Sequence, residues 1–187
     1  MRTTSYPNLD KMFIERWSPY GFSQEPIADE DIQTIFEAAR WSPSSYNEQP
    51  WRFAFAQEEK DLQQFRSVLV DANQTWANKA PLLIFVFSKK HFTQNDNPNP
   101  WASFDTGAAS MALSLQANKL GLHTHVMGGI HADKAFKVTG MNPEKYDVVC
   151  AIAVGKLDDD HSIEAGGNKK RSVRKELDEF VFEMKVQ

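Results

Sequence analysis

The stretch Trp41-Ser42-Pro43-Ser44-Ser45-Tyr46-Asn47-Glu48-Gln49-Pro50-Trp51 separates a helical pattern from a strand pattern. Pro43 ends the helix, because the residue before a proline disfavours the α region. Polar connections between rigid elements commonly carry binding sites. Asn47 and Gln49 each offer an amide donor and an amide acceptor, which suits the edge of a planar heterocycle. A polar turn without a function fits the local pattern equally well.

The segments on either side of this stretch alternate between helical and extended patterns. Ile32, Ile35, Phe36 and Ala39 follow helical spacing and predict a helix that begins near three acidic residues at 29–31. Further helices are predicted at residues 8–15, 62–69, 105–120 and 132–139. Strands are predicted at residues 51–57, 81–87, 122–127 and 148–154, two of them apolar enough to be buried on both faces. Residues 95–100 are too rich in Asn and Pro for regular structure.

The composition limits the class of protein. The chain has 187 residues, of which 41% are hydrophobic, and a formal net charge of −4. One domain over residues 1–187 is expected, and the negative charge argues against nonspecific nucleic-acid binding. No apolar run reaches the roughly 18 residues of a membrane span. Residues 1–10 hold no apolar secretion signal and Cys150 is the only cysteine, so we expect a cytoplasmic protein without disulfides.

The chain lacks the common catalytic and nucleotide-binding motifs. His123 and His125 lie on one side of a predicted strand, but no third ligand is near in sequence, so no metal site is expected. The chain holds no Gly-x-Ser-x-Gly elbow, no Gly-x-Gly-x-x-Gly and no Walker loop. What remains is a set of basic residues near both ends, the amide-rich loop, and Gly128-Gly129 after a strand. Together these features match the needs of a flavin mononucleotide (FMN) site.

The chain changes character after Gly155. A polar stretch follows at residues 158–170, then a basic cluster at 169–175 and an apolar segment at 177–182. A tail of this kind has little of its own to pack on. It either returns to its own core or lies across a second subunit, and residues 157–187 are predicted to form such an extension.

The ordered motifs of the chain resemble the FMN-dependent nitroreductase family between about residues 13 and 181. The strongest match is Ala38-Ala39-Arg40-Trp41-Ser42-Pro43-Ser44-Ser45-x-Asn47-x-Gln49-Pro50-Trp51. Shorter matches are Arg16-x-Ser18, Asp105-x-Gly107-Ala108-Ala109, Gly121-Leu122, Met127-Gly128-Gly129, Ala151-Ile152-Ala153-Val154-Gly155 and Arg174-Lys175-x-Leu177-Asp178-Glu179-Phe180.

The resemblance implies an α+β fold with three α/β/α layers, a central and mostly antiparallel sheet, and an intertwined homodimer whose FMN sites use both subunits. Arg16 and Arg174 would bind the phosphate, with Arg171 as a further candidate and Ser18 at the phosphate or ribityl end. Ser44 and Ser45 would reach the FMN from the partner subunit.

The resemblance also assigns residues to the flavin ring. Asn47 would bind the pyrimidine edge beside Gln49, Gly128 and Gly129 would present N–H groups to N5 and O4, and Asn73 would contact the ring. Tyr20 stands where the family often has Arg or Lys near the N1–O2 edge, and Gly128-Gly129 replaces a frequent Glu-Gly pair.

The implied reaction is a ping-pong transfer from NAD(P)H through the flavin to a flat acceptor such as a nitroaromatic or a quinone. No side-chain acid or base is indispensable to it, so no catalytic residue is named. Two alternatives stay open. One is an FMN-binding sensor or carrier without turnover, and the other is a specialised relative that acts on dioxygen or halogenated aromatics.

Overall fold

A four-stranded sheet forms the centre of the computed structural model, which describes residues 4–158 and 171–184. The strands are β1 (Trp51–Ala56), β2 (Leu82–Lys89), β3 (His123–Met127) and β4 (Tyr146–Gly155). Their order is β1-β2-β4-β3 and every pairing is antiparallel. The two inner strands, β2 and β4, carry the longest apolar runs, because an inner strand is buried on both faces.

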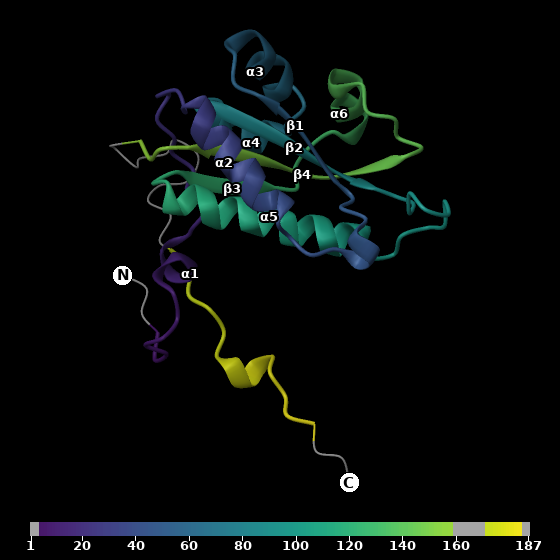
Figure 1. Ribbon diagram of the computed structural model, residues 1–187. Helices are drawn as coiled ribbons and strands as arrows, with labels where there is room; N and C mark the ends of the chain where they lie inside the picture. Colours follow the sequence, from purple (N-terminus) through teal and green to yellow (C-terminus); the bar gives the residue numbers. More distant parts are fainter. Residues whose placement is uncertain (1–3, 159–170, 185–187) are drawn as a thin grey trace.

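Helices α2 (Asp29–Arg40) and α5 (Ala102–Lys119) cover one face of the sheet (Figure 1). Ile32, Ile35 and Ala39 of α2 are buried there, in agreement with the predicted helical spacing. The small residues Ala109 and Ala117 of α5 are also buried, and small side chains let a helix approach its neighbours closely. The long helix α5 is therefore held against both α2 and the sheet.

The opposite face is covered by α3 (Glu59–Arg66), α4 (Asp71–Ala77) and α6 (Ala132–Thr139). Phe65 of α3 stacks on Phe85 of β2 with ring centroids 4.4 Å apart. Helix α6 ends at Gly140, whose φ of 71° lies in the left-handed region that glycine adopts without strain. The predicted three-layer α/β/α arrangement with an antiparallel sheet is thus confirmed.

Several element boundaries differ from the predictions. Helix α3 ends at Arg66 rather than at residue 69, and Val68 and Leu69 are buried in the connection that follows it. Helix α4 was not predicted, because its seven residues are too few to establish a period. Helix α5 begins at Ala102, three residues before the predicted start at Asp105.

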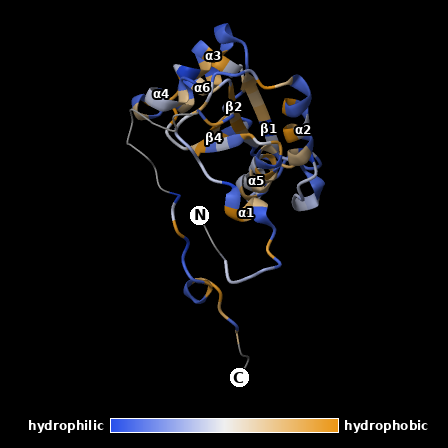
Figure 2. Cartoon of the chain, turned by 90° about the vertical axis from the view of Figure 1, so that its left-hand side faces the viewer, coloured by the Kyte–Doolittle hydropathy of each residue, from blue (hydrophilic) through white to orange (hydrophobic). Residues whose placement is uncertain are grey.

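The first and last described segments, residues 4–15 and 171–184, lie outside the three layers (Figure 1). They carry α1 (Lys11–Glu15) and the short 3₁₀ turn η2 (Leu177–Glu179). The apolar side chains of Phe180, Val181 and Phe182 are 56%, 59% and 72% exposed. Figure 2 shows this tail leaving the body of the molecule with apolar stretches along it. Most of the predicted polar stretch, residues 159–170, lies outside the described residues.

Candidate functional site

The loop between α2 and β1 adopts a backbone that is unusual for its residues. It contains the 3₁₀ turn η1 (Ser45–Asn47), and Tyr46, Asn47 and Gln49 have φ values of 51°, 55° and 49°. A left-handed conformation costs about 1–2 kcal/mol for a residue with a side chain. Such strain persists where the surroundings fix the backbone, and it is concentrated at functional sites.

Hydrogen bonds fix the course of this loop. The backbone N–H of Gln49 donates to Ser44 Oγ at 2.9 Å, and the N–H of Ser45 donates to Asp105 Oδ2 at 3.0 Å. The Gln49 side chain donates from Nε2 to Asn47 Oδ1 at 3.2 Å. Gln49 therefore orients the Asn47 amide, and Ser44 closes the turn.

A second group of predicted residues gathers at the end of the molecule that carries α1. Arg16 is half-buried, and two causes lower the pKa of its guanidinium: burial first, and then the positive charge of Arg174. The guanidinium of Arg171 lies over the ring of Trp17, 5.1 Å from the ring centroid. Two like charges held near each other, with one half-buried, form a place where a bound anion would be stabilised.

The segment that follows Arg16 runs along the edge strand β3. The ring of Trp17 lies edge-on to His123 at 6.2 Å, and His125 Nδ1 lies 2.6 Å from the carbonyl oxygen of Pro19. Since a carbonyl oxygen only accepts, this His125 nitrogen carries the proton. Ser18 lies half-buried within the same segment.

Strand β3 leads directly to the glycine pair. The carbonyl oxygen of Gly129 accepts hydrogen bonds from Asn73 Nδ2 at 3.0 Å and from the N–H of Val70 at 3.1 Å. A Cβ atom added to Gly129 would lie 2.6 Å from Asn73 Nδ2 and 2.8 Å from Val70 Cγ2, whereas one added to Gly128 would meet nothing within 4 Å. Position 129 therefore needs a glycine, because neighbouring side chains lie where a Cβ atom would be. The Asn73 amide holds the Gly129 carbonyl group in place. Gly128 faces open space that a ligand can approach.

One protomer does not bring all the predicted residues together. The N–H of Ser45 is bound to Asp105 in the first turn of α5, while α1 lies below the opposite end of that helix (Figure 1). The 18 residues of α5 span about 27 Å. Arg16, Ser18, Arg171 and Arg174 therefore belong to the α1 end, and the loop at residues 44–49 belongs to the other end.

Tyr20 packs into an aromatic cluster beside β3. Its ring centroid lies 4.9 Å from that of Trp76 and 4.8 Å from that of His125, and the rings of Trp76 and His125 stack at 4.2 Å. These contacts give Tyr20 a packing role, whatever effect it has on a neighbouring ligand.

Two carboxylates near the loop received no role from the sequence. Asp105 is 5% exposed and accepts from Ser45, and the side chain of Glu48 is 6% exposed and binds Lys89. Periodicity gave no signal for either residue, because the partners lie 60 and 41 residues away. A buried carboxylate that accepts a hydrogen bond from a distant part of the chain is the feature that identifies them in the structure.

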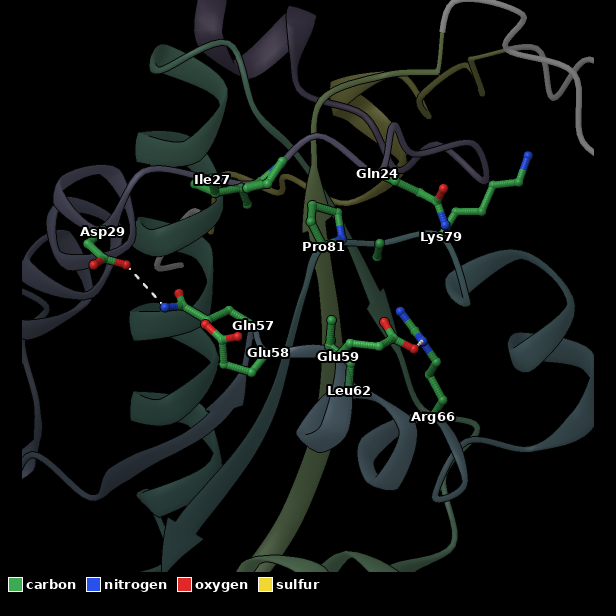
Figure 3. A pocket seen from close by; sticks show the side chains of 12 residues that line it. Gln24, Ile27, Asp29, Gln57, Glu58, Glu59, Leu62, Arg66, Lys79 and Pro81 are labelled. Carbon is green, nitrogen blue, oxygen red and sulfur yellow. Dashed lines mark hydrogen bonds and ion pairs between the residues drawn. The ribbon is translucent and has the colours of Figure 1, made fainter.

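A cavity of about 400 Å³ lies elsewhere, between the starts of α2 and α3 (Figure 3). Several of its polar side chains bind one another or a neighbour: Gln57 Nε2 donates to Asp29 Oδ1 at 3.1 Å, and Arg66 pairs with Glu59 at 2.8 Å. None of the predicted site residues lines this cavity. Within residues 4–158 and 171–184, no group of three or more His, Cys, Asp or Glu residues is arranged to hold a metal ion. No described helix is long and apolar enough to cross a membrane.

Comparisons with known proteins agree on one family. The model of the nitroreductase family matches residues 14–71 and 54–156. An oxygen-insensitive NADPH nitroreductase from Helicobacter acinonychis is 27% identical over 164 residues, which cover 70% of this chain and 78% of that protein.

Solved structures share the fold over nearly the whole chain. A crystal structure described as an oxidoreductase containing FMN is 36% identical, with a TM-score of 0.89, and the match covers 100% of this chain and 96% of that chain. A structure from Exiguobacterium sibiricum in complex with FMN is 23% identical with a TM-score of 0.79, covering 97% of this chain and 100% of that chain. At that identity the second likeness supports the fold alone.

Proposed function

The chain belongs to the nitroreductase family, and from that premise we propose that it is an FMN-dependent oxidoreductase with NAD(P)H as its electron donor. The observation that carries the proposal is the gathering of positive charge, with Arg174 near enough to the half-buried Arg16 to lower its pKa, towards one end of β3, and Gly128-Gly129 directly after the other end. A phosphate would neutralise the two guanidiniums, and the open side of Gly128 would admit a flat ring.

The residues of this chain fit the two ends of FMN. Arg16 and Arg174 would bind the phosphate and Ser18 would hold the phosphate or ribityl end, while Arg171, placed over Trp17, would add positive charge. Gly128 and Gly129 would present backbone N–H groups to the ring. Asn73 would act through Gly129, because its amide is bonded to the Gly129 carbonyl group.

The remaining residues would come from a second copy of the chain. The loop at residues 44–49 lies about one α5 length from Arg16, so Ser44, Ser45 and Asn47 would complete the partner's site rather than their own. Gln49 would hold the Asn47 amide in place.

Exposed apolar surface supports a homodimer. Phe104 and Met111 lie two turns apart on α5 and are 75% and 42% exposed, and the helix between them has small residues. The apolar tail is exposed as well. A second copy that covers α5 and receives the extension at residues 157–187 would remove both surfaces from water.

The cofactor would supply the redox chemistry: bound FMN takes a hydride from NAD(P)H and then passes electrons to a nitroaromatic, a quinone or a similar flat acceptor in a ping-pong cycle. This chain would bind and orient the cofactor and hold the acceptor over it. We place the reaction in the cytoplasm, where NAD(P)H is available and Cys150 stays reduced.

The test begins with the absorption spectrum of the purified protein, which should show flavin bands. Steady consumption of NADH or NADPH with menadione or a nitrofuran should follow, and the two donors should be compared directly. Bound flavin without turnover would support the carrier alternative. Turnover only with dioxygen or a halogenated aromatic would support the specialised relative, and a colourless protein that binds no added FMN would refute the proposal.

A further inference from the structure

Glu48 lies on the surface loop between α2 and β1, yet its side chain is only 6% exposed. Oε1 accepts from Lys89 Nζ at 2.9 Å and from Thr93 Oγ1 at 2.6 Å, and Oε2 accepts from the N–H of Thr93 at 2.8 Å. Lys89 Nζ also donates to Thr93 Oγ1 at 2.6 Å. The three residues form a closed network that joins this loop to the end of β2.

Glu48 lies at the point of the loop where its network can hold the unusual backbone. Its neighbours on both sides, Asn47 and Gln49, have left-handed backbones, and so does Tyr46. Fixing the Glu48 side chain fixes the backbone between these residues, and such strain persists only where several contacts determine it. The network is therefore placed to hold the loop in its unusual course.

Stability alone is a weak explanation for this arrangement. The Glu48 side chain is buried but that of Lys89 is 21% exposed, and neither a buried nor a partly exposed ion pair recovers much more free energy than its desolvation and ordering cost. In Glu48, burial raises the pKa of the carboxyl group while the hydrogen bonds from Thr93 and Lys89 lower it, and the net pKa is below the ordinary value. The carboxylate is thus held in its charged form by the groups that it anchors.

The geometry points to Glu48 as a positioning residue that, through Lys89 and Thr93, holds the Asn47 amide ready for the flavin ring of the partner subunit's site. This inference rests on the proposed function, in which the loop at residues 44–49 reaches that ring. Glu48 itself touches no ligand in this scheme. It holds the loop in its binding conformation beforehand, so that the loop does not have to rearrange when the flavin binds.

The first measurement uses the flavin-free protein and does not depend on the cofactor. The N–H groups of Asn47 and Glu48 are bonded to the carbonyl oxygens of Ser44 and Ser45, so their hydrogen exchange reports opening of the loop. Glu48→Gln should speed this exchange about tenfold, a factor within the range of coupling in one network. Thr93→Val, which keeps the ion pair, should speed it in the same direction.

Glu25→Gln is the matched control, because Glu25 is also ion-paired, to Lys156, but is exposed and lies outside the loop. This control should leave exchange at residues 44–50 unchanged. Unchanged exchange in both Glu48→Gln and Thr93→Val would overturn the inference, even if both variants were less stable.

The second measurement compares the affinities for FMN and riboflavin. The loop would contact the flavin ring and not the phosphate. Glu48→Gln should therefore lower the affinities for FMN and riboflavin by the same factor, about tenfold. The double variant with Thr93→Val should lose little more than Glu48→Gln alone, since both act on one network. Faster exchange with unchanged affinities would refute the positioning role. A wild-type protein that binds neither flavin would refute the proposed function, and the exchange result would still decide whether Glu48 holds the loop.

Discussion

Replacing Arg174 by alanine tests the phosphate site most directly. Arg174 lies close enough to Arg16 to lower its pKa, which means that the two guanidiniums repel each other when no anion lies between them. A bound phosphate would turn this repulsion into two charge-assisted contacts. We therefore expect Arg174→Ala and Arg16→Ala to weaken FMN far more than riboflavin, which has the same ring and ribityl chain but no phosphate.

The expected loss follows from the contact that is removed. A hydrogen bond to a charged group contributes about 1.5–3 kcal/mol. At about 1.4 kcal/mol for each factor of ten, this corresponds to a roughly ten- to hundredfold loss of FMN affinity. The flavin-free Arg174→Ala protein should be no less stable than the wild type, because the variant removes a like charge from the neighbourhood of Arg16.

The assay is a titration of the flavin-free protein with each flavin, followed by fluorescence at two salt concentrations. The loss for FMN should shrink at high salt, since screening weakens the phosphate contact. Lys175→Ala is the control: Lys175 is adjacent, equally charged and exposed like Arg174, but its Nζ lies 3.7 Å from Glu179 Oε2. Equal losses for FMN and riboflavin in Arg174→Ala would show that this arginine does not contact the phosphate.

Three further outcomes are expected. Deleting the chain from Leu177 onward should abolish both the dimer and flavin binding, because the exposed apolar tail would lie across the partner. A truncated protein that is monomeric by light scattering and still shows flavin absorbance would contradict this. Gly129→Ala should lower the melting temperature, since its Cβ would lie 2.6 Å from Asn73 Nδ2 and overpacking costs about 1–3 kcal/mol, whereas Gly128→Ala should leave it unchanged. Two unit charges 4 Å apart interact by roughly 4 kcal/mol at an effective dielectric of about 20. A quarter of that energy corresponds to roughly 20 mV in a two-electron couple, so Tyr20→Lys should raise the midpoint potential of bound FMN by about that amount. An unchanged midpoint in spectroelectrochemical titration, together with lower stability, would mean that the Tyr20 ring only packs.

The sequence by itself was sufficient for the elements that repeat a local pattern. The helical spacing of Ile32, Ile35 and Ala39 predicted α2, and the apolar runs predicted the inner strands β2 and β4. Residues 132–139 were predicted as a helix ending at Gly140, and the structure has the same bounds. These predictions succeed because period and end signals lie within a few residues of one another. The motif at residues 38–51 identified the family for a similar reason, since its specificity lies in one short stretch.

Only the tertiary structure decided how distant residues meet. Ser45 lies against Asp105, and Glu48 lies against Lys89 and Thr93, and no local period links these residues. Packing of α5 on the sheet sets the first contact, and the path of the chain after β2 sets the second. The left-handed backbone at Tyr46 and Asn47 is equally a tertiary result, because neither residue type prefers it strongly enough to overcome its cost without the surrounding contacts.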